Sequence, residues 1–377
     1  MRFTRGLIHE SRFALIPEPR QSIIGEMSRE EKIESFNPND PGQHDGNLFG
    51  LPFTPEEARI VVLPVPWDVT TSYRPGTSAG PQSILAASKQ IDLYDPALPD
   101  AWKLGVAMVD IPEALVHLNH ELRPKAEQII LAMEQGIDPS ADPLLRSLIA
   151  EVNAGCARMV DRVRTDASGW LDQGKRVVGL GGDHSTPLGL LQALAERHDT
   201  FGVLQIDAHA DLREAYEHFT FSHASILLNA LKLDQISSLV QVGLRDVCEE
   251  EVAFTQAHAD RIHPFTDRDI KHALYRGETL AQVHQRIVDR LPGLVYITLD
   301  IDGLDPALCP HTGTPVPGGL AFEACLHLVE CVVASGRTII GFDLNEVSPG
   351  KDDEWDANVG ARLLFRLINQ MAVSQRM

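Results

Sequence analysis

The chain has 377 residues, of which 44% are hydrophobic, and its 33 basic and 53 acidic residues give a net charge of −20. This length and composition indicate a folded globular protein of one or two domains and exclude a disordered chain. The acidic balance argues against nucleic acid and anionic membranes as partners, because both require a basic surface, and it favours a cationic small molecule.

Cysteine usage and the lack of long apolar runs predict the compartment. No apolar stretch approaches the roughly 20 residues of a membrane span. Residues 1–17 are interrupted by charged side chains, so they lack the continuous apolar core of a secretory signal. We therefore expect a cytoplasmic protein with reduced thiols. No two cysteines have Cys-x-x-Cys spacing; they are Cys156, Cys248, Cys309, Cys325 and Cys331.

The first part of the chain is expected to precede the main domain. Residues 1–57 are predicted to form an N-terminal extension, since residues 34–47 are rich in turn-forming residues. The first strong strand is expected at 59–66. A loop at 67–80 and a helix that begins near Pro81 follow it.

The next part of the chain predicts a further strand, an insertion and a long helix. Residues 104–111 are apolar and predict a strand. Residues 117–143 are polar and end in a proline-containing break, so they are predicted to be an insertion in the main domain, 58–377. Residues 144–173 carry apolar side chains at helical spacing.

From residue 176 the chain alternates between apolar strands and amphipathic helices. Strands are expected at 176–180, 201–206, 239–244, 294–299 and 338–345, and helices at 187–197, 222–233, 279–290 and 322–334. Such alternation predicts an α/β protein with a three-layer α/β/α arrangement around a mainly parallel sheet.

Three acidic clusters each follow one of these strands. They are residues 181–185 (Gly-Gly-Asp-His-Ser), 207–211 (Asp-Ala-His-Ala-Asp) and 300–302 (Asp-Ile-Asp). A fourth acid, Glu346, follows the last strand. Ligands of open α/β sheets collect beyond the carboxyl ends of the strands, so we expect all four places to face one cleft. Alternate residues that leave a strand point to the same side, which lets each cluster converge on one point.

The clusters supply six potential metal ligands. One ion rarely needs six side chains from three strand ends, whereas two ions that share bridging carboxylates do. Two ions about 3.5 Å apart hold a hydroxide that is nucleophilic at neutral pH. Four carboxylates and two imidazoles suit a hard or borderline divalent ion, either Mn²⁺ or Ni²⁺. The sequence therefore predicts a dinuclear metal hydrolase with His184, Asp207, His209, Asp211, Asp300 and Asp302 as ligands.

The three clusters resemble the signature motifs of the ureohydrolases, the arginase and agmatinase family. The resemblance covers about residues 58–370 and includes residues 72–76, 311–319 and 343–349. It implies an arginase-like fold, hydrolysis of a guanidino C–N bond with release of urea, and assembly into a homotrimer or homohexamer.

The resemblance also implies a role for each matching residue. It assigns the six ligands to two ions: His184 and Asp211 to the first, His209 and Asp302 to the second, and Asp207 and Asp300 to both. Asp183 would orient a ligand imidazole. His223 would transfer a proton to the leaving nitrogen, for which an imidazole is suited near neutral pH. Glu346 would accept paired N–H groups from the guanidinium.

The substrate is expected to be small. The loop at 67–77 departs from the agmatinase form, and residues 90–95 and 355–364 are similar to a subgroup that includes nickel-dependent hydrolases of free guanidine. Trp355 follows a loop predicted to overhang the cleft, where an indole could shorten the pocket or stack on a guanidinium. Thr71 is a second candidate substrate contact. Guanidine or a short alkylguanidine is favoured, with agmatine and guanidinobutyrate as alternatives. His311 stands where agmatinases tend to have glycine.

Two other functions stay open. The chain could be a non-catalytic subunit of a ureohydrolase-like assembly, although such proteins typically lose metal ligands and all six are present here. The same metal centre could instead cleave a formimidoyl group and release formamide. A metal count and product analysis separate these alternatives from a urea-releasing enzyme.

Overall fold

The computed structural model of the protein describes residues 27–43 and 45–377. The described residues fall into two compact units, one that ends at Phe36 and one that spans Asn37–Met377. In the first, helix α1 (Arg29–Ser35) begins with a capping box, in which Ser28 and Glu31 each accept the other's backbone N–H. Residues 1–26 of the predicted N-terminal extension lie outside the described residues.

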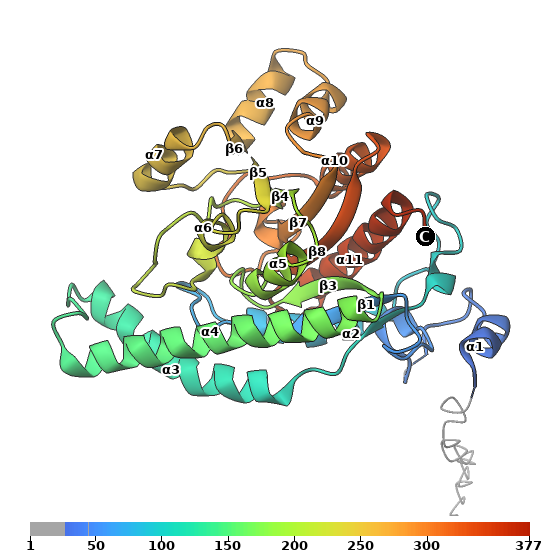
Figure 1. Cartoon of the computed structure of the whole chain (residues 1–377), viewed down its shortest axis with the longest axis horizontal. Helices are drawn as coiled ribbons and strands as arrows, with labels where there is room; N and C mark the ends of the chain where they lie inside the picture. Colours follow the sequence, from blue (N-terminus) through green and yellow to red (C-terminus); the bar gives the residue numbers. More distant parts are fainter. Residues whose placement is uncertain (1–26, 44) are drawn as a thin grey trace, which may run out of the picture. The chain divides into compact units, whose positions relative to one another are not determined.

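The second unit is built on one eight-stranded sheet (Figure 1). Its strands are β1 (Ile60–Val65), β2 (Val106–Met108), β3 (Arg176–Gly181), β4 (Phe201–Ile206), β5 (Ile236–Val242), β6 (Ile262–Phe265), β7 (Leu294–Asp300) and β8 (Thr338–Asn345). Their order is β2-β1-β3-β8-β7-β4-β5-β6, and every neighbouring pair is parallel. The predicted parallel α/β architecture is confirmed.

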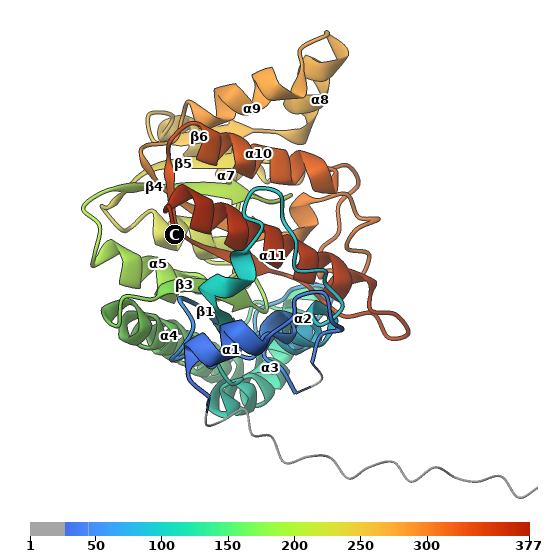
Figure 2. The ribbon, with the colours of Figure 1, turned by 90° about the vertical axis from the view of Figure 1, so that its right-hand side faces the viewer.

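Helices cover both faces of the sheet (Figures 1 and 2). They are α2 (Gly80–Ser88), α3 (Glu113–Glu134), α4 (Pro143–Asp172), α5 (Leu188–Ala195), α6 (Ile226–Ala230), α7 (Glu249–Ala257), α8 (Asp267–Tyr275), α9 (Leu280–Val288), α10 (Phe322–Ala334) and α11 (Trp355–Ser374). The packing runs in series from α3 through α4 and α5 to α6, and separately from α2 through α11 and α10 to α9. The central strands β1 and β4 are buried at every residue, as expected for strands covered on both faces.

The segment predicted as a polar insertion, 117–143, consists mostly of helix α3. Its side chains Leu122, Ala126 and Ile129 are buried in the same hydrophobic core as those of α4. Helix α4 begins where Asp142 accepts the backbone N–H groups of the first turn. The segment is therefore part of a packed layer, and its status as an insertion stays a prediction.

Part of the predicted N-terminal extension also packs within the main unit, which begins at Asn37. The predicted boundary of the catalytic domain at residue 58 stays a prediction. Leu48, Phe49, Leu51 and Phe53 are buried. The ring of Phe49 packs edge-on against Phe365 of α11, with ring centroids 5.3 Å apart. These apolar contacts anchor residues 48–53 against the last helix.

Apart from α1 and α3, which lie in the predicted extension and the predicted insertion, four of the described α-helices and strands have no counterpart among the predicted ones: α7, β6, α8 and α11. Strand β6 lies at the edge of the sheet and contains Pro264, which is tolerated at an edge because one side of the strand needs no partner. Helix α8 is short and mainly polar, and only Ile270 and Ala273 are buried, so it offers few apolar residues to a sequence pattern. Helix α11 begins at Trp355, directly after the loop that was predicted to overhang the cleft.

The topology brings the acidic clusters to one edge of the sheet. Strands β3, β8, β7 and β4 are adjacent, and all run in the same direction. After β3, Gly182 passes so close to Trp67 that an added Cβ would lie 1.9 Å from the Trp67 carbonyl oxygen. Glycine is therefore required where the chain turns into the first cluster.

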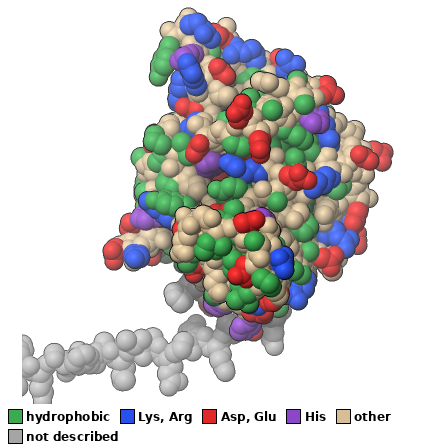
Figure 3. Space-filling model, turned by 90° about the vertical axis from the view of Figure 1, so that its left-hand side faces the viewer, with side chains coloured by type: hydrophobic (Ala, Val, Ile, Leu, Met, Phe, Trp, Pro, Cys, Tyr) green, Lys and Arg blue, Asp and Glu red, His purple; other side chains and the backbone are tan. Residues whose placement is uncertain are grey.

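The charged residues show no single-sign patch on the face in Figure 3, where acidic and basic side chains are interspersed. Within residues 27–43 and 45–377, no helix is long and apolar enough to cross a membrane.

Candidate dinuclear metal centre

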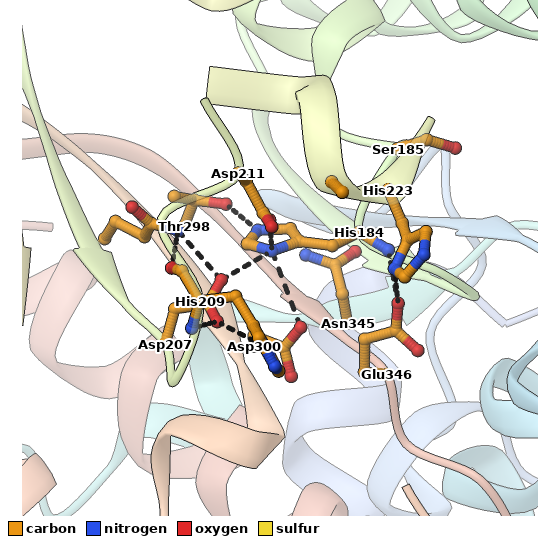
Figure 4. Close-up of polar contacts among 12 residues, drawn as sticks. His184, Ser185, Asp207, His209, Asp211, His223, Thr298, Asp300, Asn345 and Glu346 are labelled. Carbon is orange, nitrogen blue, oxygen red and sulfur yellow. Dashed lines mark hydrogen bonds and ion pairs between the residues drawn. The ribbon is translucent and has the colours of Figure 1, made fainter. Parts of the chain in front are cut away.

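The predicted ligands come together beyond the carboxyl ends of β3, β4 and β7 (Figure 4). Two groups have ligand atoms within 4.8 Å of one another: His184, Asp207 and Asp211 form the first, and Asp207, His209 and Asp302 form the second. Asp300 Oδ2 lies 3.5 Å from His184 Nδ1, beside the first group. Both groups contain Asp207, and a carboxylate shared in this way is what a bridging ligand requires.

A hydrogen-bonded chain fixes the tautomer of His184. The Thr298 hydroxyl donates to Asp343 Oδ1 over 2.8 Å, so it accepts from His184 Nε2, which is also 2.8 Å away. In the neutral imidazole, Nδ1 is then the nitrogen that carries the lone pair. It is buried without a hydrogen bond, although Asp207 and Asp211 oxygens lie 2.9 and 3.0 Å from it. Lone pairs that converge on one point fit a cation better than they fit each other.

Hydrogen bonds from nearby backbone N–H groups and one side-chain amide hold the carboxylates of the second group. His209 Nδ1 lies 3.1 Å from Asp302 Oδ2 and 3.6 Å from Asp207 Oδ1. The backbone N–H of His209 donates to Asp207 Oδ1 over 2.6 Å, and the side-chain amide of Gln205 donates to Asp207 Oδ2 over 2.8 Å. Asp302 Oδ1 accepts the backbone N–H of Ala208 at 3.1 Å. These bonds point the carboxylates at the space between the two imidazoles.

The electrostatics of the cluster call for positive charge. Burial, together with Asp302 and Asp207, raises the pKa of Asp300 well above its ordinary value. Burial and the charge of Asp207 raise the pKa of Asp211 to about 7. Burial alone would lower the pKa of His209, but Asp302 and Asp207 raise it to about 12. Four ionised carboxylates and two neutral imidazoles would balance two divalent cations, so the donor set fits a pair of such ions.

Glu346 lies directly behind the first group. It follows β8 with a left-handed backbone (φ 61°), a conformation that is uncommon for a residue other than glycine. Its backbone N–H donates to the Gly182 carbonyl over 2.8 Å. Its Oε1 accepts the backbone N–H of His184 at 2.9 Å, whereas Oε2 is buried without a hydrogen bond. Burial raises the pKa of this carboxyl well above its ordinary value, with a further contribution from Asp183.

His223 faces the same space from the short helix η5 (His223–Ser225). Its Nδ1 lies 3.8 Å from Glu346 Oε1, and its Nε2 lies 3.3 Å from the Ser72 hydroxyl. Burial, helped by His209 and His184, lowers the pKa of His223 to about 3. The imidazole is therefore neutral near pH 7.

A cavity of about 390 Å³ opens beside the cluster. His209, Asp211 and His223 line its inner end. Tyr216 forms part of the cavity wall. The Arg213 guanidinium lies over the Tyr216 ring, 4.6 Å from the ring centroid. Asp246, Val247 and Cys248 line the cavity as well, and Asp246 is exposed.

Thr71 is buried near Glu346. A Cβ added to Gly313 would lie 3.4 Å from Thr71 Cγ2 and 3.5 Å from Glu346 Oε2, so both side chains flank the same glycine. The Thr71 hydroxyl has no hydrogen-bond partner in the described part of the chain. Its carbonyl accepts from Arg123 of α3 over 2.6 Å, which ties the loop at 67–80 to the α3 layer.

Trp355 lies elsewhere. It is not among the residues that line the cavity beside His223, and 48% of its surface is exposed. Its indole N–H donates to the Ala307 carbonyl over 2.9 Å. The predicted contact between Trp355 and a substrate stays a prediction.

Asp183 and Thr298 differ from the sequence-based interpretation, in which Asp183 orients a ligand imidazole. Asp183 accepts from Ser185 Oγ at 2.5 Å and from Thr70 Oγ1 at 3.3 Å, and no bond to an imidazole is present in the described chain. Thr298 orients His184 instead. The signal for Thr298 was its place two residues before Asp300, on the same side of a strand.

Comparison with known proteins identifies the family. Residues 58–369 match the sequence profile of the arginase family. The chain is 35% identical to N(1)-aminopropylagmatine ureohydrolase of Thermus thermophilus over 305 residues, which covers 80% of this chain and 87% of that protein. It is 28% identical to agmatinase of Bacillus anthracis over 312 residues, 82% of this chain and 91% of that protein.

Solved structures show the same fold. Agmatine ureohydrolase of Thermoplasma volcanium superposes with a TM-score of 0.63 at 24% identity, covering 92% of this chain and 99% of that one. Proclavaminate amidinohydrolase of Streptomyces clavuligerus superposes with a TM-score of 0.67 at 23% identity, covering 89% and 100%. The chain therefore belongs to the arginase family and is a ureohydrolase, an enzyme that hydrolyses guanidino C–N bonds.

Proposed function

We propose that the protein hydrolyses the guanidino C–N bond of guanidine or a short alkylguanidine, giving urea and ammonia or an amine. The supporting observation is the buried, unpaired Oε2 of Glu346, which shares the flank of Gly313 with Thr71. A guanidinium offers a planar set of N–H donors, which a carboxylate accepts in pairs. A guanidinium would satisfy both Glu346 Oε2 and the Thr71 hydroxyl, which lack hydrogen-bond partners. It would also balance the buried negative charge of the Glu346 carboxylate, which is costly alone.

Two divalent ions would be held by the six ligands, His184 and Asp211 on one, His209 and Asp302 on the other, and Asp207 and Asp300 on both. When bound, such a pair makes a water molecule nucleophilic at neutral pH. The sharing of Asp207 between the two ligand groups supports its bridging role. Ni²⁺ and Mn²⁺ both accept this set of ligands.

His223 would move the proton. Its imidazole, with Nδ1 3.8 Å from Glu346 Oε1, could accept a proton from the attacking water and deliver it to the leaving nitrogen as the C–N bond breaks. Glu346 would hold the guanidinium with its central carbon toward the metal ligands. Ser72, 3.3 Å from His223 Nε2, would keep that ring atom oriented when the substrate is absent.

A second candidate is a longer substrate, agmatine or a derivative of it, with guanidinobutyrate as a further alternative. Tyr216 and the exposed Asp246 both line the cavity of about 390 Å³, which leaves room for an aliphatic tail with a cationic end. The names of the relatives support this alternative. The loop at 67–77 and the residues that begin α11 support the small substrate. A homotrimer or homohexamer remains part of the proposal.

A urea-release screen tests the proposal. The purified chain is loaded separately with Ni²⁺ and Mn²⁺ and supplied with guanidine, methylguanidine, agmatine, guanidinobutyrate and arginine. We expect the highest kcat/KM for guanidine or methylguanidine. A kcat/KM for agmatine far above that for guanidine would overturn the small-substrate proposal. Formamide in place of urea would overturn the assigned reaction.

A further inference from the structure

The segment between the last metal ligand and α10 forms a closed loop, residues 304–320. It follows the short helix η6 (Ile301–Gly303). Asp305 donates its backbone N–H to the Leu320 carbonyl over 2.9 Å, and Leu320 donates to the Gly303 carbonyl over 3.1 Å. These two bonds fix the ends of the 304–320 loop but leave the position of its far side to other contacts.

Two threonines of the 304–320 loop contact the active site. The buried Thr312 hydroxyl donates to the backbone carbonyl of Glu346 over 2.8 Å. The Thr314 hydroxyl lies 3.4 Å from Asp302 Oδ2. Because Glu346 has an uncommon left-handed backbone, bonds to its main chain decide where its carboxylate points. The position of Thr312 therefore bears directly on the guanidinium-binding group.

His311, the residue before Thr312, is hydrogen-bonded to the first turn of α11. Its backbone N–H donates to Asp356 Oδ1 over 2.9 Å, and its Nδ1 lies 2.8 Å from Asp356 Oδ2. Asp356 is fully buried, so its charge needs both bonds. No other hydrogen bond to the Asp356 carboxylate occurs in the described residues. We call this two-bond contact the His311–Asp356 fork.

A second bond joins the same two segments beside the fork. The indole N–H of Trp355 donates to the Ala307 carbonyl over 2.9 Å. Asp353 supports the same turn: its Oδ1 accepts the backbone N–H of Trp355 over 3.0 Å, and its Oδ2 is 3.9 Å from His311 Nε2. The fork and the indole thus fix the far side of the 304–320 loop.

We propose that His311 and Asp356 are positioning residues of this hydrolase, with Trp355 as a supporting contact. The fork holds the 304–320 loop against α11, the loop holds Thr312, and Thr312 holds the backbone that aims the Glu346 carboxylate. This inference rests on the proposed role of Glu346 in binding the guanidinium. It also gives a physical reason for histidine at position 311: glycine there could keep the backbone bond but not the one from Nδ1.

Removal of the imidazole leaves a buried carboxylate oxygen without a partner, which is destabilising unless the loop moves to let water in. Movement of the loop would shift Thr312 and weaken the hold on the substrate. For His311→Ala we expect kcat/KM to fall about ten-fold or more, mostly through a higher KM, as for other outer-layer partners of an active site. His311→Asn should restore most of it, because its amide nitrogen occupies the place of Nδ1.

The experiment measures kcat, KM, bound metal and thermal unfolding for the holoenzyme and four variants: His311→Ala, His311→Asn, Trp355→Phe and Asp352→Ala. Asp352→Ala, at an exposed position of the same turn, is the matched control and should equal the wild type. Trp355→Phe keeps the ring and removes the bond to Ala307, so KM should rise by a smaller factor. Because Trp355 is about half exposed, Trp355→Phe should fold, and the proposal stays testable if His311→Ala does not fold.

The inference is supported if KM rises in His311→Ala and is restored in His311→Asn while metal content stays at the wild-type value. It is overturned if His311→Ala is within two-fold of the wild type, if His311→Asn is as impaired as His311→Ala, or, where His311→Ala does not fold, if Trp355→Phe leaves KM unchanged. Failure of the proposed function is a separate result, since it would appear as no urea from the wild-type enzyme with any guanidino compound.

Discussion

The imidazole of His184 donates through Nε2 to the hydroxyl of Thr298, 2.8 Å away, and this bond leaves Nδ1 free among the carboxylates. The Thr298 hydroxyl can play this part because it donates its own hydrogen to Asp343. A strand residue that contacts no proposed ion thus fixes which ring nitrogen is a base.

Replacement of Thr298 by valine should therefore weaken metal binding. Valine has a similar shape but no hydroxyl, so the His184 ring loses the acceptor for Nε2–H and its Nδ1 lone pair is no longer fixed. We expect metal affinity to fall about 10- to 100-fold. Metal titration followed by activity measures this, with Thr298→Ser as the control that retains the hydroxyl. Equal affinity in Thr298→Val and the wild type would contradict the role of Thr298.

Glu346→Gln should separate substrate binding from metal binding. The glutamine keeps the acceptor for the His184 backbone N–H but loses the charge that would pair with a guanidinium. Hydrogen bonds to charged groups contribute about 1.5–3 kcal/mol, so kcat/KM should fall about 10- to 100-fold. Metal content should stay at the wild-type value. An unchanged kcat/KM would contradict the proposed binding of the guanidinium by Glu346. Glu323→Gln, at an exposed position on α10, serves as the control.

Gly182→Ala should destabilise the fold where the chain enters the first cluster. The added Cβ would lie 1.9 Å from the Trp67 carbonyl oxygen, so the backbone has to move. Overpacking of this kind costs about 1–3 kcal/mol. The matched control is Gly169→Ala in α4, where an added Cβ meets nothing within 4 Å. The control should stabilise by up to about 1 kcal/mol, because alanine favours a helix. Denaturant unfolding measures the free energy of unfolding of both variants. Equal stability of Gly182→Ala and Gly169→Ala would contradict the steric argument.

The stability of the protein should fall in mild acid, in part through His284. This histidine of α9 lies against His327, with its Nδ1 2.7 Å from that of His327. Burial, together with His327, lowers the pKa of His284 to about 4. An unfolded chain takes up this proton near pH 6.5, so the folded state loses stability as pH falls from about 6.5 to about 4.

His284→Gln removes that titration, so its free energy of unfolding should decline less over this range than that of the wild type. Denaturant unfolding at several pH values measures the slope. The exposed His120→Gln is the control and should follow the wild type. The same slope in His284→Gln and the wild type would show that His284 does not contribute.

Much of the fold and the ligand set could be predicted because the signals are local. Strands β4 and β8 read as short apolar runs, and alternate residues such as Asp207 and His209 face the same way by the geometry of extended backbone. The convergence of the clusters followed from the rule for the carboxyl ends of parallel strands.

The rest depended on contacts between distant segments. The apolar stripe of α3 is spaced among many polar residues, so the sequence alone does not indicate a helix that packs against α4. The position of Trp355 depends on a bond to Ala307, and the role of Thr298 depends on the approach of His184 from another strand. Sequence spacing carries no information about such pairs.

The most direct test of the dinuclear centre is a metal count per subunit in the wild type and in Asp207→Ala, made together with the urea-release assay. Asp207 belongs to both ligand groups, so its loss should affect both ions at once. We predict two ions and urea release for the wild type, and depleted metal with no urea for Asp207→Ala. Full activity and unchanged metal in Asp207→Ala, or an active wild type without metal, would contradict this account.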